Sequence, residues 1–220
     1  VTTEFAATST PFPSVTPAQL HGIEINEYAH QLAQTSIQIG YIQWLGENGF
    51  GAPPEPILQQ LDNIQHMDAI LAYDADGKAV EPAWPAADVI ISNPPFLGGK
   101  IMRTELGDAY MDALFKLYDG RVPREADLVC YWFEKAHAMI EQSWAKRTGL
   151  LATNSIRGGA NRRVLERIKQ SGDIFWAISD RDWVLDGANV HVSMIGFDNG
   201  TDGSHILDGS NVSHINPDLT

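Results

Sequence analysis

The sequence has almost no cysteine. Its 220 residues include one, Cys130, so no disulfide can form within the chain and no site with several cysteine ligands can hold a metal ion. The seven histidines show no HExxH spacing and no other paired-ligand motif, and the sequence therefore predicts no metal centre. Because stable disulfides belong to oxidising compartments, a single cysteine in a chain of this length favours a cytoplasmic protein.

Long hydrophobic runs are missing as well. No apolar stretch approaches the roughly 20 residues that a membrane-spanning helix needs. The N-terminus lacks the basic and then apolar pattern of a signal peptide. We therefore expect no membrane partner.

Basic residues are scarce, since 15 Lys and Arg face 28 Asp and Glu and leave a formal net charge of -13. Duplex DNA binding draws much of its affinity from Lys and Arg on phosphates, so the bulk charge argues against strong DNA binding by this chain alone. The basic residues that exist gather after two predicted strands. We predict a phosphate-facing rim on an acidic body, and solvated helix faces are the alternative. The two clusters are Lys100, Arg103, Arg121 and Arg124, and then Arg157, Arg162, Arg163 and Arg167. Within them, the rim residues predicted to contact DNA are Lys100, Arg103, Arg157, Arg162 and Arg163.

Against these absences stands one informative motif. The apolar run DVIIS, residues 88–92, ends in Asn93-Pro94-Pro95-Phe96, which places the tetrapeptide at the carboxyl edge of a sheet, where ligands of open α/β sheets bind. The prolines stiffen the turn and leave its carbonyls free as acceptors. The Asn93 side chain can accept a hydrogen bond from an amino group, and Phe96 offers a flat face for stacking.

This combination suits methylation of a planar exocyclic amine such as that of adenine. The lone pair of the amine is delocalised into the ring, so it is a poor nucleophile. Two acceptors, the Asn93 amide and the Pro94 carbonyl, can hold the amine protons and favour a pyramidal nitrogen. A base in a duplex has to flip out to reach such a pocket. A plain Pro-Pro turn is the alternative for the tetrapeptide alone.

The rest of the chain alternates between strands and helices. Strands are expected at 22–25, within 57–71 with an end near Asp68, and at 88–92, 149–154, 174–178 and 191–197. Helices are expected after residue 25 and at 125–146 and 161–170. Such alternation predicts an α/β fold with a mostly parallel sheet, one antiparallel strand and helices on both faces. Residues 1–19 are expected to be a loop or frayed terminus, residues 20–198 a catalytic core, and residues 199–220 a linker towards a further domain.

The tetrapeptide resembles the [DNS]-P-P-[FYW] signature of amino-methyltransferases. With NPPFLGGK, DGRVPREADLVCYWFEKA and ATNSIRGGANRR, most of residues 20–198 resembles the MmeI-like DNA adenine methyltransferases of restriction-modification systems. The resemblance implies a Rossmann-like fold, S-adenosylmethionine as cofactor, and duplex DNA with a flipped adenine as partner. A bare NPPF also fits RNA or protein-glutamine methyltransferases.

The resemblance also implies roles for individual residues. Asn93, Pro94, Pro95 and Phe96 form the catalytic motif. Glu24 would hold the cofactor ribose, although an acid at a helix N-terminus is the alternative. Asp68 would contact the cofactor's adenine amine or be a turn aspartate, and Ile25 and Ile70 would line the adenine slot or belong to the core.

The same resemblance places two further regions near the target-base pocket. One is the loop from Asn154 to Gly159, which follows the next strand and has a polar helix-initiating loop as its alternative. The other is the last hairpin, with Trp183, Asn189 and His191.

One expected feature is absent. Such enzymes bind the methionine part of the cofactor with a Gly-X-Gly turn after their first strand, and no glycine precedes Gly22. We therefore expect a fragment of the methyltransferase domain. Loss of that strand would expose a sheet edge through which the chain could associate with another copy. A catalytically inactive piece with a structural role is the alternative to an enzyme.

Overall fold

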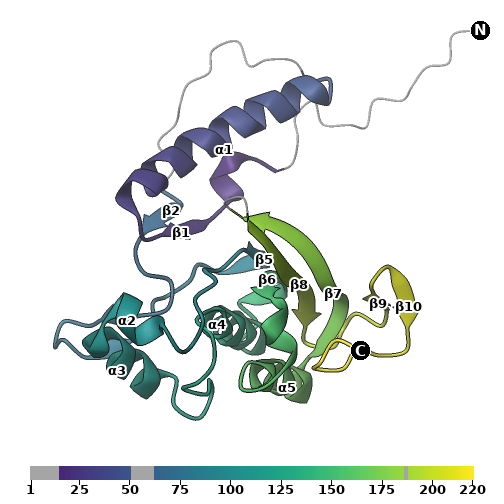
Figure 1. Ribbon diagram of the computed structural model, residues 1–220. Coiled ribbons are helices and arrows are strands. Elements are labelled where there is room, and N and C mark those ends of the chain that lie inside the picture. Colours follow the sequence, from purple (N-terminus) through teal and green to yellow (C-terminus); the bar gives the residue numbers. More distant parts are fainter. Residues whose placement is uncertain (1–14, 51–61, 186–187) are drawn as a thin grey trace, which may run out of the picture. The chain divides into compact units, whose positions relative to one another are not determined.

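The computed structural model describes residues 15–50, 62–185 and 188–220 of the chain (Figure 1). The chain forms two compact units, Val1–Ala69 and Ile70–Thr220. The motif loop belongs to the second unit, whereas most of the predicted cofactor residues belong to the first.

The first unit consists of a long helix packed on a pair of parallel strands. Its elements are the 3-10 helix η1 (Pro17–Gln19), β1 (Gly22–Glu24), α1 (Glu27–Glu47) and β2 (Ile64–His66). Asn26 begins α1, because its side chain accepts a hydrogen bond from the Ala29 amide at 2.9 Å. The His30 ring lies 2.8 Å from the Ile64 carbonyl and joins helix to strand. In the described parts of the chain, α1 included, we find no helix with the length and apolar character for crossing a membrane.

The second unit is built on a six-stranded sheet. Its elements in chain order are β3 (Ala72–Tyr73), β4 (Ala79–Val80), β5 (Ala87–Ser92), α2 (Met102–Leu106), α3 (Asp108–Leu117), α4 (Val129–Glu141), β6 (Ala145–Thr153), η2 (Asn154–Arg157), α5 (Arg162–Ser171), β7 (Asp173–Leu185), β8 (Ala188–Asp198), β9 (His205–Leu207) and β10 (Ser210–Val212). The short strands β3 and β4 form a separate antiparallel pair.

The strand order of the main sheet is β10-β9-β7-β8-β6-β5. Strands β5, β6, β7 and β9 run in one direction, and β8 and β10 run in the other. The predicted α/β, Rossmann-like fold is confirmed, and β8 is the antiparallel strand expected before residue 198. One antiparallel strand was predicted, whereas the sheet has a second, β10, in the polar segment after residue 198.

Helices α4 and α5 pack against strands β6 and β7 of this sheet. The core between them is apolar and closed: Phe133 of α4 and Phe197 of β8 are both fully buried, and their rings stack with centroids 6.0 Å apart. Leu165 and Ile168 of α5 are also fully buried. These side chains hold the helices on the sheet.

Several element boundaries differ from those predicted. The helix expected at 125–146 is α4, Val129–Glu141, because Ser143 with a φ of 60° ends the turn and Ala145 already starts β6. Strands β6, β7 and β8 are longer than expected. Pairing along the β7–β8 hairpin extends both strands into polar sequence that shows no strand pattern of its own.

The polar segment after Asp198, expected to be a linker, contains two strands of the main sheet. Strand β9 pairs in parallel with β7, with Ile206 opposite Trp176. The Asp208 carboxylate accepts hydrogen bonds from the Ser179 amide at 2.8 Å and the Ser179 hydroxyl at 2.7 Å. The linker interpretation of residues 205–212 was wrong because these tertiary contacts, and not local propensity, form the strands. The division of the chain into domains otherwise stays a prediction.

Strand β5 is an edge of the main sheet. Two of its apolar side chains are open to solvent, with Val89 49% and Ile91 83% exposed. An edge strand with exposed apolar side chains is a template for further pairing. Self-association through this edge stays a prediction.

The buried ring pair gives a test of the core. Replacing Phe133 with Ala removes its stacking on Phe197 and leaves a cavity, and we expect the free energy of unfolding to fall by about 3–5 kcal/mol. Val184→Ala is the control, because Val184 is 73% exposed and its loss should change stability by less than about 0.5 kcal/mol. Urea unfolding of the chain measures both, and equal effects would contradict the assigned core.

Candidate active site

The motif loop follows the carboxyl end of β5, as the sequence predicts. Ser92, the last residue of β5, is paired with Leu150 of the parallel strand β6. Asn93 is exposed, Pro94 is buried and Phe96 is half-buried. Among the residues that the structure describes, neither the Asn93 side chain nor the Pro94 carbonyl has a hydrogen-bond partner. An exposed side-chain acceptor, the unpartnered carbonyl of a buried proline and a half-buried aromatic ring therefore lie together at one sheet edge.

The loop after β6 lies beside the motif loop, because parallel neighbours end at the same edge. In this second loop the Ser155 hydroxyl donates to the Asp127 carboxylate at 2.8 Å. The same carboxylate accepts the Gly99 amide at 2.9 Å. The structure thus connects the NPPFLGG segment with the segment beginning at Asn154 at one edge of the sheet, as predicted. That both segments border one target-base pocket stays a prediction.

Asp127 and Asn161 were not predicted as site residues. Each lies outside the tetrapeptide, and their side chains meet only because α4 and α5 start at the same edge of the sheet. The Asn161 amide donates to Asp127 at 2.7 Å. A sequence signal was available, since both residues occur in the strings that carry the family resemblance, but no spacing in the sequence shows that they touch.

The last hairpin contributes a charged pair beside the same loops. The Asn154 amide lies 3.4 Å from the Asp180 carboxylate, and the other oxygen of that carboxylate lies 2.8 Å from His191 Nδ1. This hydrogen bond raises the pKa of His191 and lowers the pKa of Asp180. The predicted residue Asn189 donates to Asp182 at 3.1 Å. The structure therefore brings His191 to Asn154 through Asp180.

The predicted cofactor residues of the first unit lie at the carboxyl ends of two paired strands. Glu24 of β1 is the register partner of His66 of β2, and the Met67 amide donates to the Glu24 carbonyl at 3.1 Å. The strand ends therefore bring Glu24 and Ile25 beside the segment that leads to Asp68. Ile70 belongs to the second unit and its side chain is fully buried.

The residues at this strand end fit the adenosyl part of S-adenosylmethionine. Glu24 Oε1 accepts the Asn26 amide at 2.7 Å, and within the described residues Oε2 has no partner, so it is available to ribose hydroxyls. Ile25 is 65% exposed and offers an apolar surface to a purine ring. The Gly-X-Gly turn expected to bind the methionine part would precede Gly22. Residues 1–14 of that segment lie outside the described residues.

Three of the five predicted rim residues are already engaged. Arg103 forms ion pairs with Asp108 at 2.8 Å and Asp112 at 2.9 Å. Arg157 donates to the Asp218 carbonyl at 3.0 Å. Arg162 is paired with Glu166. The exposed ion pairs of Arg103 and Arg162 are weak, so phosphates can compete for these two side chains. The Arg157 contact is a part-buried hydrogen bond.

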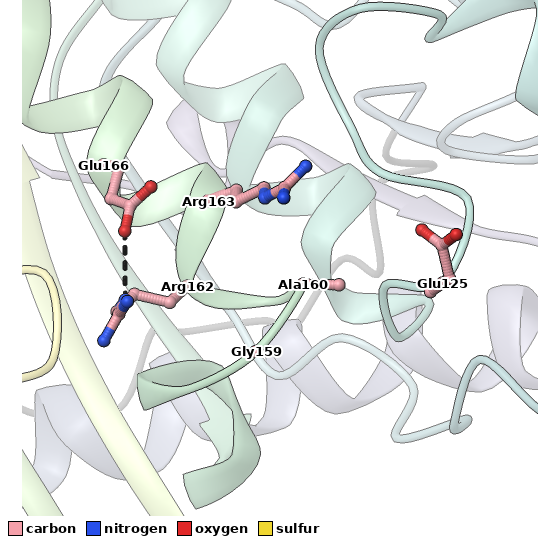
Figure 2. A pocket seen from close by; sticks show the side chains of 6 residues that line it. All are labelled: Glu125, Gly159, Ala160, Arg162, Arg163 and Glu166. Carbon is pink, nitrogen blue, oxygen red and sulfur yellow. Dashed lines mark hydrogen bonds and ion pairs between the residues drawn. The ribbon is translucent and has the colours of Figure 1, made fainter.

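The side chains of the other two rim residues, Lys100 and Arg163, have no hydrogen-bond or ion-pair partner among the described residues. Figure 2 shows the Arg163 side chain directed away from Glu166, which binds Arg162. Arg163 lines an open pocket of about 660 Å³ whose lining consists of Glu125, Gly159, Ala160, Arg162, Arg163 and Glu166. Contact of all five residues with DNA stays a prediction.

Cys130 is a packing residue rather than a nucleophile. Its side chain is fully buried, and burial raises the pKa of the thiol. The thiol lies 3.5 Å from the side-chain oxygen Oδ1 of Asn161. Across residues 15–50, 62–185 and 188–220, no three His, Cys, Asp or Glu side chains gather in a way that could hold a metal ion.

Comparisons with known proteins agree with this geometry. The family model described as "MmeI, DNA-methyltransferase domain" matches residues 4–208. DNA methyltransferase A of Bacillus subtilis (strain 168) is 28% identical over 193 residues, which cover 84% of this chain and 21% of the relative. The type IIL restriction-modification enzyme MmeI, solved in complex with DNA, superposes with a TM-score of 0.68 at 22% identity, covering 92% of this chain and 29% of that one. The chain thus spans less than a third of the length of these relatives.

The His191–Asp180 pair predicts a titration that nuclear magnetic resonance can follow. We expect Asp180→Asn to lower the pKa of His191 more than Asp182→Asn does, because Asp180 lies 2.8 Å from the ring and Asp182 lies 3.7 Å from it. Since the folded pKa of His191 is raised, the pair stabilises the hairpin below the ordinary histidine pKa. That contribution is lost as pH rises through the raised value. Equal shifts in the two variants would contradict the assigned pairing.

Proposed function

The chain belongs to the family of MmeI-like DNA-methyltransferase domains of restriction-modification enzymes, and from this premise we propose that it transfers a methyl group from S-adenosylmethionine to the exocyclic amine of adenine in duplex DNA. The observation that carries the proposal is the unpartnered pair of acceptors, Asn93 Oδ1 and the Pro94 carbonyl, at the carboxyl edge of β5. Both oxygens can only accept hydrogen bonds. The pair therefore selects a substrate group that donates two of them, such as an amino group.

Each motif residue has a separate part in orienting the target base. Asn93 and Pro94 each accept one hydrogen bond from the amine, which favours a pyramidal nitrogen whose lone pair is less delocalised into the ring of the base. Phe96, half-buried beside them, stacks on the flipped base and holds its plane. Pro95 keeps the turn stiff, because its ring restricts the backbone. Catalysis in this scheme comes mainly from positioning, and no covalent nucleophile is required.

S-adenosylmethionine, when bound, supplies an electrophilic methyl group on a sulfonium. We assign its adenosyl part to the strand ends of the first unit, with Glu24 on the ribose hydroxyls and Asp68 near the adenine amine. Ile25 is assigned to the adenine slot. For Ile70, whose side chain is fully buried in the second unit, the alternative of a core residue is favoured. The free Glu24 oxygen and the exposed Ile25 support the first part of this assignment. The nitrogen of the target base would form the new N–C bond as the bond between the methyl group and the sulfonium sulfur breaks. The electron pair of the broken bond would stay on sulfur, which leaves as the thioether S-adenosylhomocysteine, and the methylated nitrogen would lose a proton to solvent.

The DNA partner is assigned to the edge that carries the motif loop. The side chains of Lys100 and Arg163 are free to meet phosphates, and Arg103 and Arg162 can exchange their exposed carboxylate partners for them. Arg157 would have to exchange its hydrogen bond to the Asp218 carbonyl. With a net charge of -13, this chain needs further affinity, which we assign to the rest of the polypeptide. A flipped adenine is required, because the amine of a stacked base cannot reach Asn93. We place the reaction in the cytoplasm.

Substitution of Asn93 tests the proposal in the complete polypeptide that contains this chain. Asn93→Ala removes one of the two amine acceptors, and we expect methyl transfer to duplex DNA to fall by at least about a hundredfold. Binding of S-adenosylmethionine, measured by calorimetry, should not change. Asn211→Ala is the matched control, because Asn211 is exposed on β10 and far along the sheet from β5.

The acceptor of the methyl group decides between substrate classes. We would follow labelled methyl transfer from S-adenosylmethionine to duplex DNA, ribosomal RNA and a release-factor protein, and digest any labelled DNA to nucleosides. Label in N6-methyladenine supports the proposal. Near-normal transfer by Asn93→Ala, or label confined to RNA or protein, would overturn it.

A further inference from the structure

The carboxylate of Asp127 joins three segments of the chain at the motif edge. Its Oδ1 accepts the Gly99 amide at 2.9 Å. Its Oδ2 accepts the Ser155 hydroxyl at 2.8 Å and the Asn161 side-chain amide at 2.7 Å. The motif loop, the loop after β6 and the start of α5 are therefore tied to one side chain. Hydrogen bonds to a charged acceptor are stronger than neutral ones.

Asn161 also accepts a hydrogen bond from the backbone of Asp127 and so holds that residue in place. Its side-chain oxygen Oδ1 accepts hydrogen bonds from the Asp127 backbone amide at 2.8 Å and from the Cys130 thiol at 3.5 Å. Asn161 is 8% exposed, and polar contacts shielded from water are electrostatically stronger than exposed ones. The Asp127–Asn161 pair is thus a rigid, reciprocal junction.

The backbone around Gly99 packs directly on the segment that carries Asp127. A Cβ atom at Gly99 would lie 2.5 Å from the Glu125 carbonyl oxygen and 3.0 Å from that of Ala126. The Leu128 amide also donates to the Leu97 carbonyl at 2.9 Å. At its other end the motif loop is held by the pairing of β5 with β6. Residues 93–96 therefore lie between two anchors.

We propose that Asp127 is a positioning residue for methyl transfer, which sets the separation between the Asn93–Phe96 turn and the Ser155 loop. This inference rests on the proposed function of the motif. Asp127 does not touch the base. It holds the carboxyl end of the motif loop through Gly99 and the opposite wall through Ser155, so that the acceptors of Asn93 and Pro94 meet the amine in one orientation.

Charge and shape both require a carboxylate at this position. Three donors converge on Asp127, and an amide in its place would direct its own NH2 group at one of them. Asp127→Asn is therefore expected to loosen one wall while leaving the volume of the side chain unchanged. In the exchange variant Asp127→Asn/Asn161→Asp, the new amide faces a carboxylate again, and the Gly99 amide keeps an oxygen acceptor at residue 127.

The test uses the complete polypeptide and duplex DNA of randomised sequence as substrate. For Asp127→Asn we expect the kcat of methyl transfer to fall about tenfold to a hundredfold, as for a small misplacement of reacting groups. The Kd for S-adenosylmethionine and the melting temperature should stay near those of the wild type. The exchange variant should recover part of the lost kcat. Asp119→Asn, at an exposed aspartate with no partner among the described residues, is the control and should keep full activity.

The outcomes separate the two proposals. An inactive wild-type polypeptide would overturn the proposed function, whereas an active wild type with an equally active Asp127→Asn variant would overturn only the positioning role. Parallel losses of kcat, cofactor binding and melting temperature would also overturn it, because they indicate a purely structural residue. If Asp127→Asn does not fold, Ser155→Ala serves instead, since it removes one of the three donors. A selective fall in kcat supports the positioning role, and unchanged kcat overturns it.

Discussion

The parallel pairing of β5 with β6 is the constraint on which the candidate active site depends. Because Ser92 lies opposite Leu150, the turn after β5 and the loop after β6 leave the sheet at the same edge. The pairing explains why residues more than 60 positions apart in the sequence, such as Asn93 and Ser155, can form two sides of one site. Without this register the tetrapeptide would be an isolated turn.

Several of the few basic residues in this acidic chain pair with a buried carboxylate on α4. Glu134 is 2% exposed and is paired with Arg167 at 3.0 Å and with Arg121 at 3.7 Å. Desolvation raises the pKa of Glu134 and lowers that of the neighbouring Lys135. Arg121 and Arg167 therefore stabilise the interior, where removing one partner of a buried pair is costly. This leaves fewer cations for a phosphate-facing rim than the sequence count suggests.

Some predicted site residues lie where the sequence predicts, and others have surroundings that only the fold determines. The motif residues Asn93 to Phe96 lie where the sequence predicts, since an apolar strand followed by Pro-Pro has few other placements. Arg103 illustrates the opposite case. Its position suggests a free cation, yet two aspartates of α3 engage it, and only the fold of residues 101–117 brings them there. Ile70 is similar, because its complete burial follows from packing in the second unit.

Local chemistry in the sequence determined the α/β class, the stiff turn with its two acceptors and ring, and the family resemblance, because each depends on residues adjacent in the chain. Tertiary structure alone decided three further features: the Asp127–Asn161 junction, the pairing of His191 with Asp180, and the strands β9 and β10 within a polar segment. These features depend on side chains and backbone edges that are distant in sequence. Pairing energy between such groups exists only once the sheet has brought them together.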